Sequence, residues 1–336
     1  MKTATLGSTG VRVTELSFGA AGIGNLYRPI TDEAALATVD AAWDAGIRTF
    51  DTAPHYGLGL SERRLGAALR DRPRDTYTVS TKVGRLLEPD PRGGRGDDLA
   101  HGFAVSDTHR RVWDFSADGV LRSLEASLQR LGLDRVDVAL LHDPDDHADQ
   151  ALREAYPALE RLRDEGVIGA IGVGMNQCAL PARFLRETDI DVVLLAGRYT
   201  LLEQQGLAEM LPEASARGRS VVIGGVFNSG LLIAPEPGAM YDYAPAPQPV
   251  LDRALRLKAV AERHGVPLRS AALHFPYGHP AVASVLTGAR FVDEVRDTVE
   301  QLRHPVPAAL WDDLRAEGLL APDTPTPAGT PSERSP

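Results

Sequence analysis

The chain has 336 residues, of which 43% are hydrophobic and 24% charged, and its formal net charge is -10. These values are typical of a globular protein, and the acidic charge argues against partners such as nucleic acid or anionic membrane, which attract basic surfaces. The single cysteine, Cys178, excludes an intramolecular disulfide and a cysteine-based zinc cluster, so a cytoplasmic location is expected. We find no signal peptide and no apolar run of about 18 residues, and we therefore expect no membrane segment.

The first predicted element is a β-hairpin of residues 3–6 and 11–14, joined through Gly7-Ser8-Thr9-Gly10. After it, the chain repeats one unit, in which an amphipathic helix ends in glycine and a short β-branched run follows. Glycine in this position is typical of a left-handed helix cap. The capping glycines are Gly46, Gly166 and Gly218. Hydroxyl side chains that precede acidic residues predict helix starts at Thr31, Ser61 and Ser116.

Helical stretches separate eight predicted strands, near 15–18, 47–51, 77–83, 136–142, 167–174, 191–196, 220–225 and 283–287. Alternating strands and helices indicate a parallel sheet, and eight such units favour a closed (β/α)8 barrel over an open sheet. The hairpin would then close the barrel floor. Residues 1–320 are predicted to form this single domain, with irregular loops at 88–102 and 235–249 and a disordered tail at 321–336.

Polar residues recur where these predicted strands end. Asp51 ends the second strand, Lys82 lies near the end of the third, His142 ends the fourth, and Asn176 follows the fifth. Tyr56 lies five residues after Asp51, in a loop at the same face. Each has an ordinary structural explanation when taken alone, such as a turn cap or a core histidine. Their meeting on one rim favours function, because active sites of such barrels lie at the carboxyl ends of the strands.

This combination suits proton transfer to or from a carbonyl or hydroxyl oxygen. A free phenol has a pKa near ~10, which is too high for efficient proton exchange at neutral pH. We expect the Lys82 ammonium to lower the pKa of Tyr56, Asp51 to orient Lys82, and His142 to hydrogen-bond the reacting oxygen. The set contains no activated serine or cysteine nucleophile.

Four segments in this order resemble the aldo-keto reductase family. They are the run from Phe50 to Gly57 with Gly59, Ser61, Glu62 and Gly66 after it, Thr81-Lys82-Val83-Gly84, the run from Val136 to His142, and Gly172-Val173-Gly174-Met175-Asn176. The resemblance extends from Leu6 to about Leu314. It implies a nicotinamide cofactor, NAD or NADP, and no metal, with Tyr56, Lys82, Asp51 and His142 catalytic.

The resemblance also implies the residues that hold the cofactor. Asn176 would hold the nicotinamide carboxamide, and Ser229, Gly230 and Leu231 would cradle the pyrophosphate through backbone N–H groups. The remaining implied contacts are Gly19, Ala20, Phe227, Gly288, Arg290, Glu294 and Asp297.

Several residues depart from the common family pattern. Met175 replaces a serine, Ala196 a glutamine, and Gly224-Gly225 a tyrosine that stacks on nicotinamide, so Phe227 would have to supply any stacking. Glu294 stands where NADP-preferring members often have arginine, and its carboxylate would repel a 2′-phosphate, which favours NAD. Arg290 could still neutralise such a phosphate.

These departures resemble the branch that contains D-threo-aldose (L-fucose) 1-dehydrogenases, with pyridoxal 4-dehydrogenase and L-galactose dehydrogenase as relatives. The branch implies oxidation of an aldose at C1 to the lactone by a monomer or homodimer. His55, Trp113 and His142 would contact the sugar, under a loop from Arg85 to Asp114 with His101 and Phe103. The alternatives are an NADPH-dependent aldehyde or ketone reductase, a pyridoxal 4-dehydrogenase, and a non-catalytic nicotinamide-binding subunit.

Two further motifs have weaker interpretations. Residues 19–24 read G-x-x-G-x-G rather than the Rossmann G-x-G-x-x-G, so a Rossmann fold is not predicted. Residues 142–147 contain two histidines and three aspartates, but the proline among them stiffens the run and capping of a helix start accounts for the acids. No metal site is expected.

Overall fold

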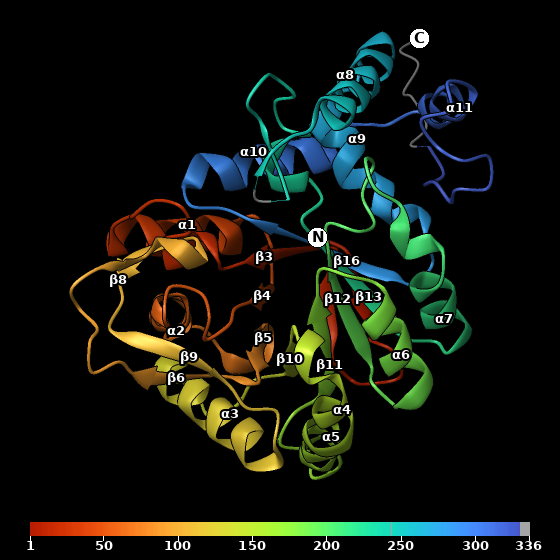
Figure 1. Ribbon diagram of the computed structural model, residues 1–336. Coiled ribbons are helices and arrows are strands. Elements are labelled where there is room, and N and C mark those ends of the chain that lie inside the picture. Colours follow the sequence, from red (N-terminus) through yellow and green to blue (C-terminus); the bar gives the residue numbers. More distant parts are fainter. Residues whose placement is uncertain (243, 330–336) are drawn as a thin grey trace.

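The computed structural model describes residues 1–242 and 244–329, and eight parallel strands form a closed barrel at its centre. Figure 1 shows the helices arranged around these strands. The strands are β3 (Leu16–Gly19), β4 (Thr49–Asp51), β5 (Thr78–Val83), β10 (Val138–His142), β11 (Ala170–Met175), β12 (Val192–Ala196), β13 (Ser220–Gly224) and β16 (Val282–Gly288). The predicted (β/α)8 barrel is confirmed, and the strand ends differ from prediction by no more than three residues.

The helices follow the strands in alternation and cover the outside of the barrel. They are α1 (Asp32–Asp44), α2 (Leu60–Leu69), α3 (Ala117–Leu131), α4 (Ala148–Gln150), α5 (Tyr156–Asp164), α6 (Ala179–Glu187), α7 (Met210–Ala216), α8 (Gln248–Arg263), α9 (Leu268–His274), α10 (Val292–Arg303) and α11 (Ala308–Ala316). A π-helical turn, Ala151–Ala155, joins α4 to α5. The predicted glycine caps adopt the left-handed conformation, because Gly46, Gly166 and Gly218 all have positive φ.

Two of the three predicted helix starts are correct. The side chain of Thr31 accepts a hydrogen bond at the start of α1, and that of Ser116 does so at the start of α3. The prediction for Ser61 is wrong, because α2 begins at Leu60. The buried Ser61 hydroxyl instead donates to the Ala20 carbonyl at 2.7 Å, which ties the loop after β3 to α2.

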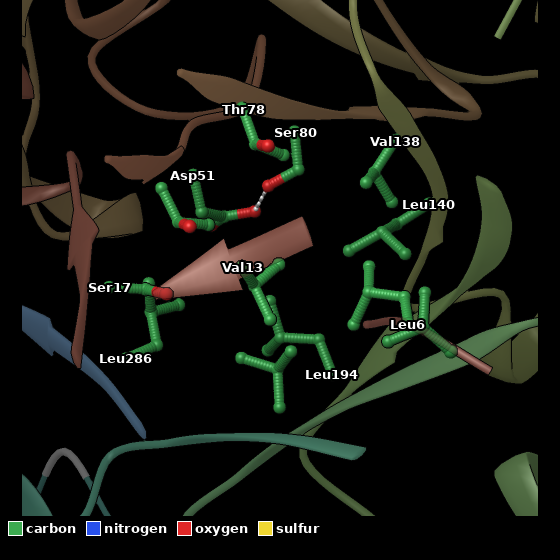
Figure 2. Close-up of a pocket in the computed structure, with 13 residues that line it drawn as sticks. Leu6, Val13, Ser17, Asp51, Thr78, Ser80, Val138, Leu140, Leu194 and Leu286 are labelled. Atoms are coloured by element: carbon green, nitrogen blue, oxygen red, sulfur yellow. Dashed lines mark hydrogen bonds between the residues drawn. The ribbon is translucent and has the colours of Figure 1, made fainter. Parts of the chain in front are cut away.

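The N-terminal hairpin closes the bottom of the barrel, as predicted. Strands β1 (Thr3–Thr5) and β2 (Arg12–Thr14) pair antiparallel, and the Gly7 amide donates to the Ser220 hydroxyl. Figure 2 shows Leu6 and Val13 pointing into a small internal cavity toward apolar residues of the barrel strands, among them Val138, Leu140 and Leu194. Asp51 and Ser80 border the same cavity. The interior of the barrel is therefore a packed core, and Asp51, one of the predicted site residues, borders it.

Residues 85–113, here called the flap, are more ordered than the predicted loop at 88–102. Strand β6 (Arg85–Pro89) pairs with β9 (His109–Trp113), and β7 (Asp97–Asp98) pairs with β8 (Phe103–Ser106). The predicted loop 235–249 contains a two-residue pair, β14 (Met240–Tyr241) with β15 (Ala244–Pro245), and the start of α8. Both predictions missed local antiparallel pairs, which are too short to show a periodic pattern.

The predicted disordered tail needs a later boundary. Thr324 is buried, and Arg315 of α11 donates to the Thr324 carbonyl and to the Thr326 hydroxyl. Residues 321–329 thus lie against the domain, although they have no core of their own, because α11 supplies side chains that bind them. The rest of the predicted tail, 330–336, lies outside the described residues.

Candidate active site

The four predicted catalytic residues come together at the carboxyl ends of three neighbouring strands. Asp51 ends β4, Lys82 lies one residue from the end of β5, and His142 ends β10. Tyr56 lies on the loop after β4. The next residue, Gly57, has φ +62° and a Cβ there would lie 2.2 Å from the Gly24 carbonyl oxygen, so only glycine allows the loop to approach this closely.

Lys82 is the centre of the cluster. Its buried Nζ donates to Asp51 Oδ2 at 2.6 Å, to the Thr52 carbonyl at 3.0 Å and to Tyr56 Oη at 3.0 Å. Ser80 donates to the other Asp51 oxygen at 2.7 Å, as Figure 2 shows. All three ammonium protons are therefore used, and one of them faces the phenol oxygen.

The pKa of Tyr56 is raised, opposite to the sequence-based expectation. Burial is the largest influence and raises the pKa of the phenol, whereas Lys82 lowers it by a smaller amount. Burial also opposes the charge of Lys82, but Asp51 and Tyr56 more than offset this, and the pKa of Lys82 is raised. The prediction that Lys82 lowers the pKa of Tyr56 is correct in sign. The predicted net decrease in that pKa is wrong, because the loss of solvation outweighs the effect of one adjacent cation. Tyr56 is consequently a neutral phenol at pH 7.

His142 is a neutral imidazole beside this phenol. Burial lowers its pKa well below the ordinary value, and the cations Arg85 and Lys82 lower it further. Its ring centroid lies 6.0 Å from that of Tyr56, and the two planes are nearly perpendicular at 86°. Its Nδ1 makes no hydrogen bond with the described residues. Because Nδ1 is buried, Nε2 is the nitrogen that can offer a hydrogen bond to a ligand oxygen, and the ring does so without carrying charge.

Tyr56, Lys82 and His142 open into a cavity of about 710 Å³, a size typical of small-molecule sites. The flap forms one wall of this cavity through Leu99, Ala100, His101, Gly102 and Phe103. His55, Asn176 and Met240 also line it. The predicted cover by His101 and Phe103 agrees with this arrangement.

Two flap residues that sequence reasoning missed hold His55. Arg111 and Asp98 form a buried ion pair, with side chains 2% and 5% exposed. Arg111 also donates from Nε to Nδ1 of His55 and from Nη2 to its carbonyl at 3.0 Å. Burial, followed by the Arg111 charge, lowers the pKa of His55 to about 2. In the sequence, Asp98 and Arg111 are two charged residues thirteen positions apart in a predicted loop. No sequence pattern indicates that they pair or that they contact His55.

Trp113 does not join the cavity to which the prediction assigned it. Its side chain is 42% exposed, and the Arg85 guanidinium lies 5.5 Å from its ring centroid. It lines a neighbouring hollow with Asp143 and the residues 145–147. The Arg85–Asp143 pair thus separates Trp113, a predicted sugar contact, from Tyr56.

The predicted pyrophosphate cradle is only partly available. Asn228, Ser229 and Gly230 all have positive φ, but the Gly230 amide donates to the Phe227 carbonyl and the Leu231 amide to that of Asn228. Of the three predicted donors, Ser229 alone has an amide without a partner among the described residues, and its hydroxyl is exposed as well. The expectation that Gly230 and Leu231 would donate is therefore wrong for this conformation, because their N–H groups close the turn.

The other predicted cofactor contacts follow the same rim. Gly19 and Gly288 lie side by side at the ends of β3 and β16, and the amide of buried Ala20 donates to the backbone carbonyl of Asp51. Glu294 accepts from the Arg290 amide at 2.7 Å and from its guanidinium at 3.1 Å. Asp297 instead forms an ion pair with Arg269 of α9 and accepts from Gln301, so its carboxylate is already engaged.

This arrangement fits an elongated dinucleotide. The exposed Asn176 follows β11, Ser229 follows β13, and Arg290 with Glu294 follows β16, along the side of the barrel rim that runs from β11 through β12 and β13 to β16. Gly19 ends β3 and residues 20–24 form the loop after it, not a Rossmann turn, and a Cβ at Gly22 would lie 2.6 Å from the Ala289 carbonyl oxygen. Gly22 therefore allows the loops after β3 and β16 to pack closely at the rim.

The acidic run 142–147 does not gather around one point. Asp143 pairs with Arg85, Asp145 accepts from Gln177, and the His147 ring lies 5.6 Å from that of Phe115. Over residues 1–242 and 244–329, no three metal-ligating side chains are grouped so as to bind an ion. No helix in those ranges is both long enough and apolar enough to cross a membrane.

Comparison with known proteins agrees with this site. Residues 15–316 match the model of the Aldo/keto reductase family. D-threo-aldose 1-dehydrogenase from Pseudomonas sp is 46% identical, covering 94% of this chain and 97% of the relative, and pyridoxal 4-dehydrogenase from Microbacterium luteolum is 42% identical with the same coverage. The holo structure of an aldo-keto reductase from Bacillus halodurans superposes with a TM-score of 0.74 at 27% identity, with both chains covered completely (100%). The chain therefore belongs to the aldo/keto reductase family and is an NAD(P)-dependent oxidoreductase.

Proposed function

We propose that this protein oxidises an aldose at C1 to the corresponding lactone. The observation that carries the chemistry is the contact of Lys82 Nζ with Tyr56 Oη at 3.0 Å, on the wall of a cavity of small-molecule size. The substrate class is supported by the aldose dehydrogenase that is 46% identical over nearly the whole chain.

Each residue of the cluster has a defined part in this reaction. A bound nicotinamide would supply the hydride acceptor. Tyr56 Oη, as the phenolate, takes the proton of the anomeric hydroxyl while the C1–H bond breaks and the C1=O bond forms. Lys82 stabilises the phenolate, Asp51 keeps Lys82 in place, and neutral His142 donates a hydrogen bond to the same substrate oxygen. In the reverse direction, the Tyr56 phenol returns its proton to the carbonyl oxygen.

NAD is the proposed acceptor rather than NADP. Glu294 lies at the start of α10, where the adenosine half is expected, and its carboxylate would repel a 2′-phosphate but accept hydrogen bonds from a ribose diol. Arg290 already pairs with Glu294 at 3.1 Å, which reduces its capacity to neutralise a phosphate.

A cytoplasmic location and a monomeric or homodimeric state complete the proposal. Cys178 is the single cysteine, and burial raises the pKa of its thiol, so it is poorly reactive. A chain with one unreactive thiol is suited to a reducing compartment.

Reduced-nicotinamide absorbance tests the function directly. The purified protein is given NAD or NADP with L-fucose, L-galactose, D-arabinose or pyridoxal. NAD-linked oxidation of at least one aldose is the expected result. Oxidation of pyridoxal alone would favour the activity of the 42% identical relative. Inactivity with all four, together with rapid NADPH-driven aldehyde reduction, would favour a reductase, and cofactor binding without turnover on a broad panel would favour a non-catalytic subunit.

A further inference from the structure

We propose that Asp143, held by Arg85, is a hydroxyl-binding residue that selects polyhydroxylated substrates. This inference rests on the proposed function in one respect, namely that the protein interconverts a carbonyl and a hydroxyl group. Asp143 would bind a hydroxyl group near the reacting carbon, so the same preference applies to an aldose that is oxidised and to a hydroxyaldehyde that is reduced.

Asp143 stands beside the reacting groups. It directly follows His142 at the end of β10 and lines the cavity with Tyr56 and Lys82. Its Oδ2 contacts Arg85 Nη2 and lies 3.6 Å from His142 Nε2. Within the described ranges, no donor is in hydrogen-bond reach of its other oxygen, Oδ1. One oxygen is therefore fixed by the protein, and the second remains free to accept.

The backbone at Asp143 is held in an unusual conformation. Its φ is +42°, in the left-handed region that side chains other than glycine, asparagine and aspartate rarely adopt. Pro144 follows and further restricts the residue before it. The Asp143 amide donates to the Gly174 carbonyl of β11 at 3.1 Å, which anchors this turn to the barrel. Such local strain is often retained where a side chain must be placed for function.

Arg85 explains how a carboxylate stays at this position. Its side chain is 11% exposed, and the ring of Trp113 lies beside its guanidinium. The guanidinium cannot lose its charge at physiological pH, so it compensates the Asp143 charge and fixes the direction of the carboxylate. Burial raises the pKa of Asp143, and Arg85 opposes that rise.

The cavity has an apolar side as well. The Phe103 ring lies 6.0 Å from that of Tyr56, and the His55 ring meets that of Phe103 edge-on at 5.3 Å. A polyhydroxylated molecule presents both C–H and O–H groups, so it matches a site with aromatic rings and a carboxylate acceptor. A substrate without hydroxyls would leave the Asp143 oxygen unpaired in the closed site, and such a mismatch gives strong discrimination.

The test uses the full-length enzyme with reduced nicotinamide and two aldehydes of equal chain length, glyceraldehyde and propanal, at pH 8. We expect the wild type to prefer glyceraldehyde by about 10- to 100-fold in kcat/KM, the value of one hydrogen bond to a charged group. In D143G this preference falls toward one, chiefly through a higher KM for glyceraldehyde, and D143N gives an intermediate ratio. Both residues tolerate positive φ, so both variants retain the turn.

Asp146, an exposed neighbour, supplies the matched control D146N, which should keep the wild-type preference. An undiminished preference in D143G, or a wild type that does not discriminate between the two aldehydes, would overturn the inference. Neither result bears on whether an aldose is oxidised at C1. Conversely, if no aldose is oxidised, the comparison of glyceraldehyde with propanal can still be made. The two proposals can therefore be contradicted independently.

Discussion

Arg111 fixes the tautomer of His55, because its Nε donates to His55 Nδ1. An arginine can only donate, so Nδ1 must accept, and the ring proton must reside on Nε2. Arg111 is bound in turn by both oxygens of Asp98. This connection joins the flap to the loop that carries Tyr56, and it makes the buried pair a structural requirement of the site.

Loss of Asp98 is the first prediction. D98N leaves the buried Arg111 charge without its counterion, and breaking a buried pair in this way costs about 3–5 kcal/mol. We expect urea unfolding to show this loss, or limited proteolysis to show earlier cleavage between 85 and 113 if the flap opens first. The control is E88Q, which breaks the exposed pair of Glu88 with Arg110 and should cost less than about 1 kcal/mol. Equal effects of the two substitutions would contradict a structural role for the buried pair.

The second prediction concerns the phenol. Y56F removes the oxygen that exchanges the proton, and we expect turnover to fall by about 10²- to 10⁴-fold while cofactor affinity stays within a factor of about three. Steady-state rates and nicotinamide fluorescence titration measure the two quantities. Tyr156 on α5 donates to Glu160 away from the site, so Y156F should retain wild-type turnover. Retained activity in Y56F would remove Tyr56 from the mechanism.

The third prediction is the pH dependence of the two reaction directions. The pKa of Tyr56 is raised by burial, so below pH 10 the phenolate is a minor form whose fraction grows tenfold per pH unit. Oxidation requires the phenolate, and log kcat/KM for oxidation should therefore rise with a slope near one between about pH 7 and 9. Reduction uses the phenol and should be flat over that range. A pH-independent oxidation rate limited by chemistry would contradict this assignment.

The fourth prediction links His55 to acid stability. Its pKa is about 2 in the folded protein and about 6.5 in the unfolded chain, so below pH 6.5 the unfolded chain binds a proton that the folded state does not. The free energy of unfolding should therefore fall with decreasing pH by up to about 1.4 kcal/mol per pH unit for this group. Denaturant unfolding at pH 7, 6 and 5 measures the slope. H55Q removes the titrating group and should be less pH-sensitive, and an identical slope in both proteins would contradict the prediction.

The fifth prediction tests nucleotide choice. E294Q removes the carboxylate charge but can keep a hydrogen bond to the Arg290 amide. We expect the ratio of kcat/KM for NADP over NAD to rise about tenfold, which corresponds to about 1.4 kcal/mol. Glu300 is exposed on the same helix, and E300Q should leave the ratio unchanged. A ratio that does not respond to E294Q would mean that Glu294 does not face the adenosine end of the cofactor.

Local chain chemistry was enough to predict the barrel and the meeting of Asp51, Tyr56, Lys82 and His142 at its rim. Gly46, Gly166 and Gly218 mark helix ends, and the alternating units impose a parallel sheet whose strand ends share one face. Asp51 and His142 end the two strands that flank β5, so their position followed from strand order alone. Ser61 shows the limit of such local signals, because its hydroxyl is used across the fold by Ala20 and not by its own helix.

Only the tertiary structure decided which charges pair and how burial shifts them. The contacts of Arg111 with Asp98 and of Arg85 with Asp143 join residues that are 13 and 58 positions apart, and no local pattern encodes such pairings. The sequence showed that a cation would stand beside Tyr56, but the sign of the net pKa shift depends on how completely the folded cavity excludes water. Solvation of a side chain depends on the whole surface that encloses it. The strand order could therefore be predicted from the chain, whereas the protonation state of Tyr56 could not.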